Sequence, residues 1–134
     1  MNIIIIILVY SIILFNINDK LSNFDRLVVN LSLSNIILLF FSYLKNNIIL
    51  KDVSHVIITI ITIIFSFNLK NKKLIKLNIL SILITIYFWI SINQCPIGHY
   101  NNFYLDQFVK YLDRFKLSYP ILIIPLINLF YKLI

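Results

Sequence analysis

The sequence contains no alanine, no glutamate, one glycine and one cysteine. Because Cys95 stands alone, neither an intrachain disulfide nor a multi-cysteine metal site can form, and the simplest role for this thiol is packing. No Gly-rich phosphate loop, no pair of catalytic acids and no nucleophile beside a base is present. We therefore assign no catalytic residue and expect no metal site and no directly bound cofactor.

Alanine, glycine and proline have GC-rich codons, and all three are scarce beside abundant Ile, Asn and Lys. This bias indicates an AT-rich genome. For a hydrophobic protein of this size we expect a mitochondrially encoded, multi-pass protein of the mitochondrial inner membrane. An AT-rich bacterial or plastid genome produces the same bias.

Charged residues are also few, at 13% of the chain, whereas 60% of the residues are apolar and the mean hydropathy is +0.94. A globule of 134 residues could not hide that much apolar surface from water. We therefore expect one integral membrane domain over residues 1–134. The basic residues that give the net charge of +7 lie at the edges of the apolar runs. We therefore interpret them as topology signals and contacts with lipid headgroups, and we expect no nucleic acid as a partner.

The apolar runs predict an all-α, polytopic membrane protein with about five transmembrane helices, since one span needs ~20 apolar residues. The expected spans are residues 2–16, 27–44, 53–68, 74–92 and 117–134. The first run lacks a basic n-region and a small-residue cleavage site, so we expect it to remain as a span. The short connections predict antiparallel neighbouring helices.

The connection before the last span is the long one. Within residues 101–116, apolar residues recur at helical spacing opposite Asp106, Lys110, Asp113 and Arg114, which predicts an amphipathic helix lying in the membrane interface. With five spans, loops one and three share a side with the C-terminus. The lysines of residues 70–73 mark that side as the matrix or cytoplasmic one and place the N-terminus outside.

Polar side chains inside the spans are the candidate functional residues. His55, Thr59, Thr62 and Ser66 follow one another at spacings of four, three and four, and so lie on one face of the third span. Such a face either packs closely, with its hydroxyls bonded back to their own helix, or lines a hydrated path or a moving joint between helices. In the second span, Asn30, Ser34 and Asn35 are expected to form hydrogen bonds between helices.

No span interior carries Asp, Lys or Arg, whereas a self-sufficient pump or transporter needs ionisable groups there. Lys76 and Lys132 lie close enough to span ends for their charges to reach the membrane surface. The sequence therefore favours a structural or coupling subunit within a larger assembly.

Several features resemble subunit 6 of mitochondrial NADH dehydrogenase, a membrane subunit of respiratory complex I, in a highly divergent form. Residues 57–67 read Ile-Ile-Thr-Ile-Ile-Thr-Ile-Ile-Phe-Ser-Phe and place Phe65 and Phe67 in register with the family's Phe-Leu-Phe. Ile97 and Gly98 look like its Ile-Gly pair, and an apolar final helix follows from Pro120. The resemblance implies a proton-pumping NADH:ubiquinone oxidoreductase, with other membrane subunits and lipids as partners.

The family's third helix is flexible and π-bulged, and this chain departs from its motif. Ile57 stands at the family's Tyr and Thr59 at its Gly, so the π-bulge is either absent here or formed in another way.

Three alternatives remain open. Residues 31–39 resemble the second span of complex I subunit 4L, although Asn35 stands where that family has its first membrane Glu. The second alternative is a membrane anchor of succinate dehydrogenase, which would use His55 as a haem ligand, or another accessory subunit of a respiratory complex. An independent small channel or holin-like protein is the third alternative.

Overall fold

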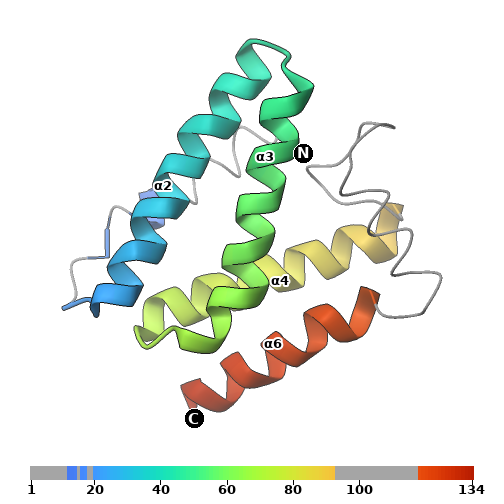
Figure 1. Cartoon of the computed structure of the whole chain (residues 1–134). Helices are drawn as coiled ribbons and strands as arrows, with labels where there is room; N and C mark the ends of the chain where they lie inside the picture. The colour runs from blue at the N-terminus through green and yellow to red at the C-terminus, as the bar shows by residue number, and fades with distance from the viewer. Residues whose placement is uncertain (1–11, 15, 18–19, 93–117) are drawn as a thin grey trace.

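The computed structural model describes residues 12–14, 16–17, 20–92 and 118–134. Helix accounts for 87% of these residues and no strand occurs among them, which confirms the all-α prediction. The bounds of the helices follow the order of the chain: α2 Asn23–Leu44, α3 Ile48–Thr59, the π-helix η1 Ile60–Ile64, the 3-10 helix η2 Phe65–Asn68, α4 Lys72–Ile92 and α6 Ser118–Leu133 (Figure 1). The predicted interfacial helix at 101–116 and most of the first span lie outside the described residues.

Two of the described helices are long and apolar enough to cross a membrane. They are α2 and the continuous run Ile48–Asn68, called the third helix below, which comprises α3, η1 and η2. The core helix of a soluble protein also passes this test of length and composition. Here, however, only 33% and 28% of the two apolar windows are buried within the chain. Pro120–Leu133 is a shorter apolar helix.

Side-chain caps start two helices earlier than the apolar runs alone predict. Ser22 Oγ accepts a hydrogen bond from the Asp25 backbone N–H at 3.1 Å, so α2 begins at Asn23 and not near residue 27. Asn47 Oδ1 likewise accepts from the Leu50 N–H at 3.1 Å, so the third helix begins at Ile48 and includes residues expected in a loop.

The helices form two antiparallel pairs. Figure 1 shows α2 and α3 side by side as a hairpin, closed by a tight turn in which Asn46 has a positive φ of 46°. It also shows α4 and α6 antiparallel to each other and running across the lower end of that hairpin. The prediction that short loops join antiparallel neighbours holds for the first hairpin. After the third helix the chain instead turns sideways, and α4 meets the third helix mainly at η1.

The hydrophobic core lies where the two pairs meet. Ile61 from η1, Ile75 and Ile82 from α4, and Leu122 and Leu129 from α6 are all buried in one cluster. The core thus holds the end of the third helix against α4 and α6.

Candidate functional site

The buried stripe of α2 is largely polar. Its buried residues are Asp25, Val28, Ser32, Asn35, Leu39 and Ser42. Their alternating spacing of three and four is that of a helix–helix seam, and α2 packs chiefly against α3 among the described elements. Phe40, Phe41 and Leu44 are exposed on the other side. A helix with serines and an asparagine inside and aromatics outside reverses the pattern of a water-soluble helix.

The third helix follows the same reversed pattern. Ser54, His55, Thr62 and Ser66 are buried, whereas Ile60 and Ile64 are exposed. Lys51 is also buried, near the start of the third helix, where its Nζ donates to Asn46 Oδ1 at 2.9 Å. We use the name polar seam for the other buried polar residues of the two helices between their end caps: Ser32, Asn35, Ser42, Ser54, His55, Thr62 and Ser66. Three of the four predicted stripe residues therefore belong to this seam, and the fourth, Thr59, is half-buried beside it.

Two hydroxyls of the predicted stripe are bonded back to their own helix. Thr59 Oγ1 donates to the His55 carbonyl at 2.8 Å, and Ser66 Oγ donates to the Ile63 carbonyl at 2.7 Å. These bonds are the ones that the packing interpretation expects. Of the polar residues predicted on the second span, Asn35 is buried, whereas Asn30 and Ser34 are exposed on the described chain.

Part of the seam retains unused hydrogen-bonding capacity. Among the described residues, Asn35 Oδ1 and Ser54 Oγ are buried and make no hydrogen bond. Nearly all buried polar atoms in proteins are satisfied, so such atoms call for a water molecule or a side chain from elsewhere. The seam can therefore accept an additional polar group at α2 and α3.

A π-helix interrupts the third helix at Ile60–Ile64. The Phe65 N–H reaches back five residues to the Ile60 carbonyl instead of four. All five residues of η1 are β-branched, and β-branched side chains crowd the preceding turn of a regular helix. The wider turn thus falls at the end of a β-branched run that begins at Val56, and no glycine is needed to form it.

A side-chain amide from α4 holds the π-helix. Asn78 Nδ2 donates to the Thr62 carbonyl at 3.3 Å, and Asn78 is only 4% exposed. A π-helix disturbs the ordinary backbone bonding, and in an apolar environment a disturbed carbonyl has to find another donor. Asn78 is that donor for η1.

A lysine from α6 caps the end of the third helix. Lys132 Nζ donates to the carbonyls of Phe67 at 2.6 Å, Leu69 at 3.1 Å and Ser66 at 3.4 Å. The last carbonyls of a helix lack partners within it and carry its negative dipole end, so an ammonium group there is doubly favourable.

The Asp25 carboxylate connects the start of α2 to the turn that follows the third helix. Asp25 is 1% exposed, its Oδ2 accepts from Ser22 Oγ at 2.7 Å, and its Oδ1 accepts from the Lys70 N–H at 3.1 Å. Phe24 and Phe65 add an edge-to-face contact with ring centroids 5.4 Å apart. The Asp25 and Lys132 contacts, named the end clamp below, thus connect α2, the third helix, the turn before α4, and α6.

Sequence reasoning missed Asn78, Lys132 and Asp25 as site residues. Ser22 and Asp25 have the spacing of a capping box, and an Asn near the middle of an apolar run is a visible signal for a hydrogen bond between helices. Lys132 was interpreted only as a residue whose charge reaches the membrane surface, and its contact with residues 63 or more positions earlier has no local signal.

No protein-family description matches the chain, and no curated protein or solved structure is detectably similar to it. Function is therefore argued from the geometry above. Among the described residues no three His, Cys, Asp or Glu side chains are grouped to hold a metal ion. What these residues can do is solvate a buried path, bond to a partner helix and hold a non-α segment in place.

Proposed function

We propose that the chain is a non-catalytic membrane-arm subunit of the proton-pumping respiratory NADH:ubiquinone oxidoreductase, with the third helix as a coupling element. The observation that carries the proposal is the π-helix η1 at Ile60–Ile64. It lies in the helix that resembles the π-bulged helix of subunit 6, directly before the Phe65 and Phe67 pair that sets the register. A sequence without the family's glycine still forms a π-helix there.

The membrane setting is supported by the reversed pattern of α2 and the third helix. Their polar residues are buried and their Ile, Leu and Phe side chains are exposed, which suits a hydrocarbon solvent. In this proposal five helices span the inner mitochondrial membrane, with the N-terminus outside and the C-terminus in the matrix. The helices α4 and α6, which run across the lower end of the α2–α3 hairpin in Figure 1, would turn to lie along that hairpin when the chain assembles with neighbouring subunits. The end clamp fits that topology, because it gathers the start of α2, the turn before α4 and the end of α6 at one end (Figure 1).

Coupling requires an element that can adopt two arrangements. A π-helix is such an element, because it can convert to α-helix. Conversion of η1 to α-helix would turn the segments on either side of it by about 100° relative to each other, one residue's share of a helical turn. Thr62 and Ser66 would then change the neighbours they face relative to His55. The Asn78 and Lys132 bonds hold the observed arrangement in place.

In the assembled complex, the unsatisfied Asn35 and Ser54 atoms of the polar seam would bond to water or to polar side chains of neighbouring subunits. Hydroxyls and ordered water can pass protons between ionisable residues without themselves holding charge. The redox chemistry would take place in other subunits.

Replacing Thr59 and Thr62 together by Val keeps the side-chain shape and removes both hydroxyls. The assembled enzyme should still oxidise NADH, while fewer protons should be pumped per NADH in inverted membrane vesicles. Thr85→Val is the matched control, because Thr85 Oγ1 makes the same kind of bond, to the Ser81 carbonyl at 2.9 Å, but in α4 and not in the third helix. Equal pumping by the double variant, the control and the wild type would show that the Thr59 and Thr62 hydroxyls contribute only to packing.

A further inference from the structure

The side of α2 that faces away from α3 repeats the spacing of the buried stripe of α2. Each of its residues follows a residue of that stripe by two positions, which is about 200° around a helix. All six residues are exposed, and they recur at the alternating spacing of three and four that packed helices use. We call this side the outer face, and its residues are Leu27, Asn30, Ser34, Ile37, Phe41 and Leu44.

Two polar side chains lie near the middle of the outer face. The 22 residues of α2 give it a length of about 33 Å, which matches a hydrocarbon core of ~30 Å. Ser34 lies next to the midpoint of the helix, and Asn30 lies about 5 Å from that midpoint. Hydrocarbon contains no water to bond to an exposed amide or hydroxyl, so these side chains require a hydrogen-bonding group from another helix at the same depth.

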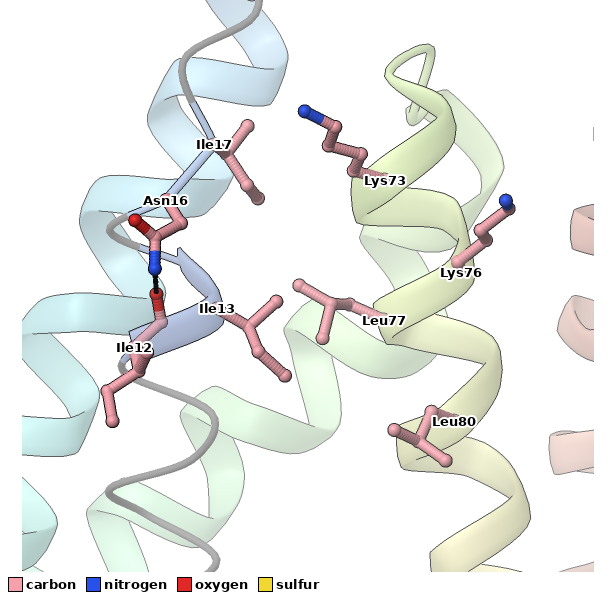
Figure 2. A pocket seen from close by; sticks show the side chains of 8 residues that line it. All are labelled: Ile12, Ile13, Asn16, Ile17, Lys73, Lys76, Leu77 and Leu80. Carbon is pink, nitrogen blue, oxygen red and sulfur yellow. Dashed lines mark hydrogen bonds between the residues drawn. The ribbon is translucent and has the colours of Figure 1, made fainter.

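Asn16 shows how an asparagine of this chain can be satisfied within its own segment. Its Nδ2 donates to the Ile12 carbonyl four residues earlier at 3.0 Å, and Figure 2 shows this bond beside the groove in which Leu77 points toward Ile13. The equivalent bond from Asn30 would go to the Arg26 carbonyl. Within the described chain neither Asn30 nor Ser34 makes a side-chain hydrogen bond, so both remain available to a partner.

Basic residues lie at both ends of the outer face. Arg26 precedes Leu27 and Lys45 follows Leu44, and both basic side chains are exposed. Positions that flank a helix–helix contact select the partner through their charges. A second copy of the chain, inserted in the same orientation, would bring Arg26 near Arg26 and Lys45 near Lys45, and like charges repel. The complementary partner is therefore a different helix with acidic residues at its ends.

We propose that the outer face of α2 binds one membrane-spanning helix of another chain. That helix carries an Asn, Gln, Asp or Glu side chain near its middle, opposite Asn30 and Ser34, and at least one acidic residue at an end, near Arg26 or Lys45. The inference rests on the membrane location in the proposed function and identifies the side of the chain that meets a neighbouring subunit. It does not depend on that subunit belonging to complex I.

Photocrosslinking from position 37 in intact membranes tests the partner. Ile37 is exposed and lies one turn after Ser34, so p-benzoylphenylalanine in its place would touch the bound helix. Irradiation should give one discrete adduct with another membrane protein. Mass spectrometry should place the attachment in a spanning helix that has the polar and acidic residues described above. The proposal is overturned by an adduct with a second copy of this chain, by an adduct with lipid alone, or by a helix without those residues.

The hydrogen bonds at mid-depth are tested on the yield of the same adduct. Asn30→Leu nearly preserves the side-chain size and removes the amide, and Ser34→Ala removes the hydroxyl. Together they should lower the yield about fivefold, as expected for two hydrogen bonds between membrane helices. Asn30→Gln retains the amide and should keep the yield. Asn68→Leu, the same change at an exposed asparagine of the third helix, is the matched control and should also keep it. A double variant that crosslinks like the wild type, or a control that loses as much yield, would overturn the proposal.

The identity of the partner separates this inference from the proposed function. A partner from the NADH-oxidising assembly would support both. A partner of the stated chemistry from a different assembly would support the role of the outer face and contradict the proposed function. A chain that does not insert into bilayers would contradict both.

Discussion

Lys132 illustrates how one side chain can determine where a helix ends. Its ammonium group bonds to three carbonyls at the end of the third helix from α6, a segment more than sixty residues further along the chain. A lysine near the end of an apolar run was expected to reach for the membrane surface. It reaches a helix terminus instead, because the carbonyls there offer both hydrogen-bond acceptors and negative potential.

Lys132→Met keeps most of the side-chain stem and removes the charge and the donors. We expect it to lower the free energy of unfolding by about 1–2 kcal/mol, near the low end of the ~1.5–3 kcal/mol for hydrogen bonds to a charged group, because Lys132 is partly exposed. Unfolding of the full chain in lipid nanodiscs, followed by circular dichroism, measures this change. Lys45→Met is the control and should be nearly neutral, since Lys45 is exposed. Equal effects of the two variants would mean that the cap contributes nothing specific.

The elements of this chain divide into those that a local pattern predicts and those that it does not. Apolar runs predicted α2, the third helix, α4 and α6, since each run is bounded by polar or charged residues. The starts of α2 and the third helix were missed by four and five residues, because the apolar runs were counted without the caps at Ser22 and Asn47. The sideways turn after the third helix was missed because it depends on Asp25, which binds the Lys70 N–H from forty-five residues away.

The candidate site was predicted only in part. Helical spacing placed His55, Thr62 and Ser66 on one face, and all three are buried. The resemblance left open whether the third helix contains a π-bulge. No residue pattern predicts its position at Ile60–Ile64, because every residue from Val56 to Ile64 is β-branched. Asn78 and Lys132 could not be assigned as its supports, since both contacts are set by the packing of α4 and α6 against the end of the third helix.

Deleting Ile64 tests the π-helix as an element. Because a π-helix contains one residue more than the α-helix it interrupts, the deletion should restore a regular helix and keep the segments on either side in register. We expect the deletion to leave stability within about 0.5 kcal/mol of wild type in nanodiscs, and to abolish coupling in the assembled enzyme. Hydrogen exchange of the third helix should slow.

Deleting Leu83, an exposed residue inside α4, is the control. It removes a residue from a regular helix, so it should rotate the following part of α4 by about 100° and displace Ile86 from the core. We expect a loss of more than about 2 kcal/mol. If both deletions were equally damaging, η1 would behave as ordinary helix and not as an inserted, switchable turn.

At the scale of the whole molecule, the polar groups of the described chain lie inside and at the two ends of the α2–α3 hairpin, and apolar side chains cover much of the outside. The described chain exposes more large apolar side chains than it buries. Such a surface suits lipid tails and neighbouring membrane subunits, and it would aggregate in water. The end clamp shows why Asp25, Lys70 and Lys132 gather at one end, which is the matrix end in the proposed topology.

Cysteine labelling tests that orientation in a Cys95→Ser background. An impermeant maleimide added to sealed mitoplasts should label Lys45→Cys in the loop between α2 and α3, and should reach Lys72→Cys only after permeabilisation. The proposed topology, which follows the positive-inside rule, places this loop outside and the start of α4 inside. Labelling of Lys72→Cys in intact mitoplasts would reverse the topology and move the end clamp to the intermembrane side.

Whether the chain is a subunit of a proton-pumping NADH dehydrogenase is tested most directly by finding the proteins with which it assembles. A tagged chain should co-migrate in a native gel with the large assembly that stains for NADH oxidation, and depleting the chain should prevent that assembly from forming its membrane arm. The account is contradicted if the tagged chain migrates alone and conducts ions when reconstituted by itself, or if it co-migrates with a succinate-oxidising assembly whose haem absorbance is lost in His55→Leu.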